Sequence, residues 1–184
     1  MQVGADLPLA HAKPDCDLFS AGLIRTIVRI TGKGDRVNLY LDLDGVILRQ
    51  ADSVAGIELA PHAFEFLKWA TECHRAHWLS TRDSHGQHSG ILRSFRLAMG
   101  CATLPVDVEA LLTSVGATSW SVSKVSAIDL ASDFVWIDDE PLAVEVAVLR
   151  GRNLLHRLVV IATNKDDDGL LRAKAAIEAL AKAP

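Results

Sequence analysis

The chain has 184 residues, of which 49% are hydrophobic and 23% are charged, and its net charge is −4 at pH 7. These values are typical of one globular domain with a short appendage, and they exclude a largely disordered chain. The acidic balance argues against broad, non-specific nucleic-acid binding, but it leaves room for a local basic groove. No apolar run reaches the roughly 18 residues that a membrane span needs, so no membrane partner is expected.

Three cysteines, Cys16, Cys73 and Cys101, are widely spaced and form no C-x-x-C pair. This usage disfavours a disulfide framework or a structural zinc site, and it favours a reducing compartment. The N-terminal residues also lack the charged-then-apolar arrangement of a signal peptide. We therefore expect a cytoplasmic protein.

Residues 1–36 are expected to form an N-terminal arm, in which residues 23–30 are apolar enough for a strand or a short helix. Residues 37–184 are then the domain. Short apolar runs predict buried strands at residues 37–41, 76–79, 134–137 and 158–162. Longer segments between and after them predict helices at residues 61–75, 88–99, 106–115, 124–131, 141–149 and 169–181.

Strands that alternate with helices predict an α/β fold, a parallel sheet with helices on both faces. Ligands of such sheets bind at the carboxyl ends of the strands. Polar residues follow three of the predicted strands: Asp42 and Asp44 the first, Ser80, Thr81 and Arg82 the second, and Asp138 and Asp139 the third. We expect these ends to converge and to carry the chemistry.

The two pairs of aspartates indicate a cation site. Asp-Gly is also an ordinary turn signal, and adjacent aspartates also occur in solvated loops. An EF-hand does not fit, because Gly45 directly follows Asp44 and loop position twelve would be Ser53. Carboxylates that meet at buried strand ends repel one another unless a cation or hydrogen-bond donors compensate. Together the pairs favour a hard cation such as Mg²⁺, which prefers oxygen ligands.

Four segments, in this order, resemble the motifs of the haloacid dehalogenase (HAD) superfamily. NLYLDLDGVIL resembles the first motif, HWLST the second, Lys124 at the head of a short helix the third, and FVWIDDEP the fourth. The resemblance runs from about Val37 to the C-terminus, and it implies a Rossmann-like HAD fold. The short segments between the motifs leave room for a minimal cap or none.

The resemblance implies a Mg²⁺-dependent phosphatase that acts through an aspartyl-phosphate. Asp42 would be the nucleophile, and Asp44 would be the general acid and then the base that activates water. Asp42, Asp138 and Asp44, the last through its backbone carbonyl, would hold Mg²⁺. Asp139 would act through a water or orient a ligand.

The remaining motif residues would bind the substrate phosphate. Ser80 or Thr81, with Ser80 favoured, would donate a hydrogen bond to a phosphate oxygen. Lys124, the only lysine between Thr81 and Asp138, would neutralise charge on the phosphoryl group and on Asp42. Arg82 would grip the phosphate from beside the site. The ordinary alternatives are a solvent-exposed lysine for Lys124 and a surface ion pair for Arg82.

The substrate is not readable from the motifs. An open site would admit bulky phosphorylated substrates such as nucleic-acid ends or phosphoproteins. The arginines Arg82, Arg93 and Arg96 mildly favour nucleic-acid ends. WLSTR, VWIDDE and DDDGLL are also similar to an HAD subgroup found in Swiss army knife RNA-repair proteins, which has Thr-Thr-Trp where this chain has Ser-Thr-Arg. A non-catalytic HAD-fold binding module is the alternative, although the presence of both Asp42 and Asp44 weighs against it. A mutase would need a closed cap.

Overall fold

The computed structural model describes residues 36–52 and 54–180, which belong to one compact unit. The expected N-terminal arm, with its strand or helix at residues 23–30, lies outside the described residues except for Arg36. No helix within the described part of the chain is long and apolar enough to cross a membrane.

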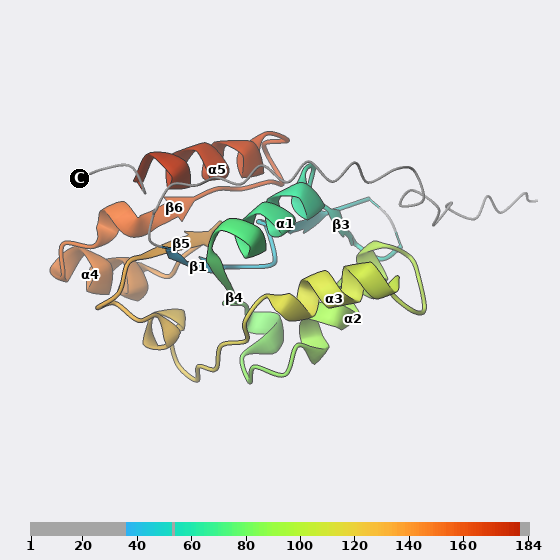
Figure 1. Cartoon of the computed structure of the whole chain (residues 1–184), viewed down its shortest axis with the longest axis horizontal. Coiled ribbons are helices and arrows are strands. Elements are labelled where there is room, and N and C mark those ends of the chain that lie inside the picture. Colours follow the sequence, from blue (N-terminus) through green and yellow to red (C-terminus); the bar gives the residue numbers. More distant parts are fainter. Residues whose placement is uncertain (1–35, 53, 181–184) are drawn as a thin grey trace, which may run out of the picture. The chain divides into compact units, whose positions relative to one another are not determined.

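Four parallel strands form the central sheet in the order β4-β1-β5-β6 (Figure 1). The strands are β1 (Asn38–Leu41), β4 (Arg75–Trp78), β5 (Phe134–Asp138) and β6 (Leu158–Val160). Leu41 lies opposite Trp78 on one side and Ile137 on the other, so the carboxyl ends of the three strands are level. The predicted α/β fold with a parallel sheet is confirmed, and all four expected strands are present.

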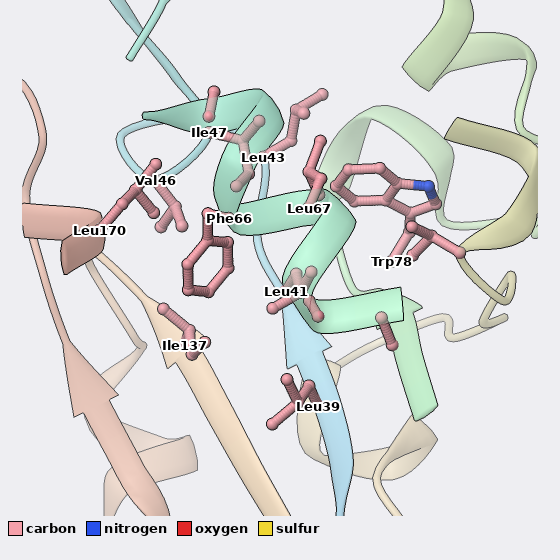
Figure 2. Close-up of a cluster of buried hydrophobic side chains, with 14 of the residues drawn as sticks. Leu39, Leu41, Leu43, Val46, Ile47, Phe66, Leu67, Trp78, Ile137 and Leu170 are labelled. Carbon is pink, nitrogen blue, oxygen red and sulfur yellow. The ribbon is translucent and has the colours of Figure 1, made fainter. Parts of the chain in front are cut away.

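The sheet is covered on both faces because its side chains alternate between two cores. Leu39, Leu41 and Ile137 belong to the first core, together with residues of α1 (Ala63–Cys73) and α5 (Gly169–Leu180). Figure 2 shows Phe66 of α1 beside Ile137 and Leu170 in this core. Tyr40 and Trp136 belong to the second core, against Leu149 of α4 (Ala143–Gly151). Apolar side chains on both faces are what a buried parallel sheet requires.

The chain between β1 and α1 forms a short antiparallel hairpin, β2 (Leu48–Gln50) and β3 (Ile57–Leu59), which we call the flap. The backbone N–H groups of Ile47 and Leu48 donate to the carbonyl of Leu43, at 2.9 and 2.8 Å. These two hydrogen bonds close the loop between β1 and the flap. The helices α2 (Ser89–Ala98) and α3 (Val106–Ser114) follow β4, and α2 packs against β3.

One helix expectation is wrong in extent. Residues 124–131 form only a single 3₁₀ turn, η2 (Lys124–Ala127), rather than a longer helix. Ile128 has an extended backbone and is buried in the second core, so the chain leaves the helical path to place this side chain. The other five expected helices are present, with somewhat different ends.

Candidate functional site

The carboxyl ends of β1 and β5 place two buried aspartates side by side. Asp42 directly follows β1, and its backbone N–H donates to the carbonyl of Ile137 at 3.0 Å, which continues the pairing of the two strands. Asp138 is the last residue of β5 and is only 1% exposed. The sheet backbone therefore fixes the position of both carboxylates, as their places after apolar runs predict.

Lys124 lies between these two carboxylates. Its Nζ donates to Oδ2 of Asp42 at 2.6 Å and to Oδ2 of Asp138 at 2.7 Å. The Lys124 side chain is buried, which contradicts an ordinary surface lysine. The head of η2 thus brings a cation to the point where the two strands end.

Asp139 completes a cluster that could hold a metal ion. One carboxylate oxygen from each of Asp42, Asp138 and Asp139 lies within 4.8 Å of the others. The donor set is all carboxylate oxygen, which suits a hard divalent cation such as Mg²⁺. Three carboxylates outnumber the single ammonium of Lys124, so a divalent cation would also balance the charge.

Gly45 makes room for the third carboxylate. Its φ is +70°, and a Cβ built there would overlap the side-chain carboxylate of Asp139. The carbonyl of Gly45 accepts hydrogen bonds from the backbone N–H and the hydroxyl of Thr163, at 2.8 and 2.9 Å. A glycine is therefore needed at this position for two reasons: its backbone conformation and its lack of a side chain.

Burial and like charge shift the pKa values of the cluster. Burial, together with the negative charge of Asp138, raises the pKa of Asp42 to about 7, although Lys124 acts in the opposite direction. Burial and the charge of Asp138 also raise the pKa of Asp139. Burial lowers the pKa of Lys124, but attraction by Asp42 and Asp138 outweighs that effect and the pKa is raised. The ammonium is thus held charged, while its single positive charge does not offset the effect of burial on Asp42 and Asp139.

Glu145 holds the backbone of Lys124 in place, a role that was not predicted from the sequence. Its side chain is 2% exposed, and its Oε1 accepts hydrogen bonds from the Lys124 backbone N–H at 2.7 Å and the Ser123 hydroxyl at 2.9 Å. Its Oε2 accepts from the backbone N–H of Leu142 at 3.0 Å. A Glu at the third position of a helix is a known capping signal, but its bond to η2 depends on the tertiary fold.

A second ion pair lies on the loops beside the cluster. The Nε of Arg82 donates to both carboxylate oxygens of Asp44, at 2.7 and 3.0 Å. The hydrogen bond to Asp44 raises the pKa of Arg82, and the negative charge of Asp42 adds to this effect. The guanidinium of Arg82 therefore interacts electrostatically with both aspartates. Arg82, expected to grip a substrate phosphate, is here the partner of Asp44.

The structure separates the two hydroxyls that follow β4. Ser80 is 1% exposed, and its hydroxyl oxygen accepts a hydrogen bond from the Arg82 backbone N–H at 3.3 Å. Thr81 is exposed and begins the short 3₁₀ turn η1 (Thr81–Asp83). Only Ser80 is fixed at the strand end next to β1.

Asp83 orders the loop from η1 to α2, another role that sequence reasoning missed. Its carboxylate accepts hydrogen bonds from the backbone N–H groups of Gln87 at 3.1 Å and His88 at 2.6 Å. Gly90 then lies so close that a Cβ built on it would overlap the carbonyl oxygen of Arg82. The start of α2 is therefore tied to the backbone of the site.

Comparisons of the chain with protein-family models, with curated proteins and with solved structures found no match.

Proposed function

We propose that the chain is a Mg²⁺-dependent phosphomonoester hydrolase in which Asp42 forms an aspartyl-phosphate. The observation that carries the proposal is the position of Asp42, whose buried carboxylate is held between Lys124 and the carboxylates of Asp138 and Asp139. The resemblance of four segments to HAD motifs supports the same assignment. Two free, partly buried cysteines, Cys73 and Cys101, accord with a reducing, cytoplasmic setting.

A divalent cation bound by Asp42, Asp138 and Asp139 would supply positive charge that lets the carboxylate and the phosphate approach each other. Lys124 adds a second positive charge next to the carboxylate of Asp42. An ionised Asp42 is needed for attack, and both cations favour that form. The excess of carboxylates in the cluster is then a requirement of the chemistry rather than a defect.

The reaction has two steps. A carboxylate oxygen of Asp42 attacks phosphorus, the ester P–O bond breaks, and Asp44 gives a proton to the leaving alkoxide. Asp44 then takes a proton from water, whose oxygen attacks phosphorus and breaks its bond to Asp42, so that inorganic phosphate leaves. Arg82 exchanges Asp44 for the substrate phosphate when substrate binds, and Ser80 donates to a phosphate oxygen.

The flap and helix α1 are the only elements between β1 and β4 in the described chain, which favours a minimal cap. Such a site remains open to bulky substrates, nucleic-acid ends among them. A binding module that keeps the fold without catalysis is the alternative. The presence of Asp42 and Asp44, and the contact of Lys124 with Asp42, weigh against it.

The test is phosphate release from a panel of phosphomonoesters, with Mg²⁺ and with EDTA. The panel contains p-nitrophenyl phosphate, mononucleotides, sugar phosphates, a phosphopeptide and oligonucleotides phosphorylated at either end. Asp42→Asn is compared with Asp107→Asn, which removes an exposed helix aspartate far from the cluster in sequence. We expect Mg²⁺-dependent release that Asp42→Asn abolishes and Asp107→Asn leaves intact. Release unaffected by EDTA or by Asp42→Asn would refute the proposal.

A further inference from the structure

We propose that the groove between α2 and the flap binds the phosphodiester backbone of a single-stranded oligonucleotide whose terminal phosphate lies at Asp42. This inference rests on the proposed function, because it names the substrate of the same site. It comes from the position of the groove, from two arginines in its wall and from the chemistry of its remaining surface.

The groove shares no lining residue with the site, but its lining helix α2 begins against the backbone of Arg82. It has a volume of about 790 Å³ and is lined on one side by Ser89, Arg93 and Arg96 of α2, and on the other by Val54 and Ala55 of the flap turn. Ser89 precedes Gly90, whose Cα lies against the carbonyl oxygen of Arg82. Because the side chain of Arg82 reaches Asp44, the first turn of α2 connects the groove to the loop that follows β1.

Two arginines in the groove have no acidic partner. Arg93 and Arg96 are exposed, and neither forms an ion pair with any residue that the structure describes. The one hydrogen bond of the Arg96 side chain is donated by its Nε to the carbonyl of Leu92, at 3.3 Å. Arg49, Arg82, Arg157 and Arg172 are paired with carboxylates. Unpaired arginines also occur elsewhere on the described surface, for example Arg150 and Arg152, so it is their shared place in one groove that sets Arg93 and Arg96 apart. No acidic side chain of the described chain lines the groove.

The spacing of the cations favours a ligand with repeated negative charges. Ser89, Arg93 and Arg96 stand at positions i, i+4 and i+7 of one helix, so they share a face. At a rise of 1.5 Å per residue, Arg93 lies about 6 Å and Arg96 about 10 Å along the axis from Ser89. Arg93 and Arg96 therefore present two guanidinium groups along one wall of the groove, and Arg82, whose backbone lies against Gly90 in the first turn of the same helix, presents a third. A chain of phosphodiesters would contact each in turn, whereas a compact monoester would reach only Arg82.

The rest of the lining is small or apolar. Val54 is fully exposed and Leu97 is 45% exposed, and Ala55 and Ala102 add small side chains. Such a surface offers sugars and bases apolar contact without hydrogen bonds that read sequence. We therefore expect binding that is independent of sequence and strongly dependent on salt. The net charge of −4 argues against non-specific binding over the whole surface.

A binding experiment without turnover tests the groove itself. The full chain in EDTA is titrated into a fluorescein-labelled oligothymidylate that carries no terminal phosphate, and fluorescence anisotropy is measured at several salt concentrations. The double variant Arg93→Gln/Arg96→Gln is compared with Arg150→Gln/Arg152→Gln, which removes two exposed arginines of α4 and its C-terminal end. Circular dichroism checks that each variant is folded.

We expect the groove variant to bind about tenfold more weakly and its salt slope to fall by about 1.4, and the control variant to bind within about twofold of the wild type. Equal losses in both variants would mean diffuse charge attraction and overturn the proposal. Undetectable binding by the wild type would overturn it too. So would an acidic phosphopeptide that competes as well as unlabelled oligothymidylate, because the occupant would then be a peptide.

Turnover separates this inference from the proposed function. If both are correct, Arg93→Gln/Arg96→Gln lowers kcat/KM about tenfold for an oligonucleotide with a terminal phosphate and leaves p-nitrophenyl phosphate hydrolysis unchanged. Mg²⁺-dependent hydrolysis of p-nitrophenyl phosphate with no effect of the double variant on oligonucleotide turnover would refute the groove alone. Arginine-dependent binding without hydrolysis of any phosphomonoester would refute the proposed function alone.

Discussion

Two groups of charges meet at the same edge of the sheet and differ in how they are held. Lys124, Asp42 and Asp138 are buried, at 8%, 6% and 1% exposure, and sheet backbone or Glu145 fixes each of them. The side chains of Arg82 and Asp44 are 35% and 41% exposed; Arg82 lies in the short turn η1 and Asp44 in the loop after β1. Buried hydrogen bonds hold the first group in place, whereas the second is open to water and, in the proposed reaction, exchanges its partner for a substrate phosphate.

The difference in burial sets what each group contributes to stability. Removing one partner of a buried charge pair costs about 3–5 kcal/mol because the other is left uncompensated. An exposed pair contributes about 0–1 kcal/mol and is screened by salt. The buried group therefore has a structural role beside the chemical role proposed for it, while the exposed pair can be changed with little effect on folding.

The largest effect is expected at Asp42. Asp42→Asn keeps the size of the side chain but removes the attacking carboxylate, so kcat should fall about a thousandfold or more. Steady-state phosphate release measures the loss, with Asp107→Asn as the matched control. A variant that keeps a tenth of the wild-type rate would remove Asp42 from the role of nucleophile.

Lys124 should affect both activity and folding. Lys124→Met retains the length of the side chain but leaves Asp42 and Asp138 facing each other without the ammonium. We expect kcat to fall about a hundredfold or more and the free energy of unfolding at pH 8 to fall by about 3–5 kcal/mol. Urea unfolding with and without Mg²⁺ measures the second effect. Mg²⁺ should restore part of the stability, and a variant as stable as the wild type would contradict the buried contacts.

The stability of the cation-free protein should depend on pH. The pKa of Asp42 is about 7 in the folded chain, raised from 3.8 mainly by burial, so the folded state binds this proton more tightly than the unfolded state. Stability is then fully present below about pH 4 and is lost as pH rises through 7, by an amount on the order of a few kcal/mol. The raised pKa of Asp139 acts in the same direction.

Thermal unfolding in EDTA at pH 5 and pH 8 measures this dependence, and Asp42→Asn is the reference that removes the group. We expect the wild type to lose stability relative to Asp42→Asn between the two pH values, and Mg²⁺ to reduce the difference. The reference matters because burial lowers the pKa values of His74 and His77, which act in the opposite direction. An unchanged difference between the two proteins would refute the assigned shift.

The smallest effect on folding is expected at the exposed pair. Arg82→Gln should change the free energy of unfolding by less than about 1 kcal/mol. If Arg82 exchanges Asp44 for the substrate phosphate, KM for p-nitrophenyl phosphate should rise about tenfold, with a smaller change in kcat. A loss of stability as large as that in Lys124→Met would remove the distinction between the two groups.

The sequence predicts the buried group well because its residues are tied to regular elements. Asp42 and Asp138 directly follow apolar runs that form adjacent strands, so their convergence follows from the sheet. The position of Lys124 also accords with its motif, although η2 is shorter than expected. Here the local pattern and the tertiary structure agree.

The roles of other residues depend on contacts that no local pattern shows. Glu145 reaches the backbone of Lys124, 21 residues away, and Arg82 reaches Asp44 across 38 residues. Each of the flap strands spans only 3 residues, too few for a clear alternation of apolar and polar side chains. Asp83 looks like an ordinary loop aspartate until the fold brings the backbone of His88 to it.

Direct capture of the phosphorylated protein tests the central claim, that Asp42 takes the phosphoryl group. Asp44→Asn should slow the second step more than the first when the leaving group is p-nitrophenolate, which needs no proton, so the intermediate should accumulate. The variant is mixed with p-nitrophenyl phosphate and Mg²⁺, quenched in acid and measured by intact-protein and peptide mass spectrometry. The account predicts one added phosphoryl group, located on Asp42 and absent in EDTA and in Asp42→Asn/Asp44→Asn. A phosphoryl group on another residue, or phosphate release by that double variant at the rate of Asp44→Asn, would contradict it.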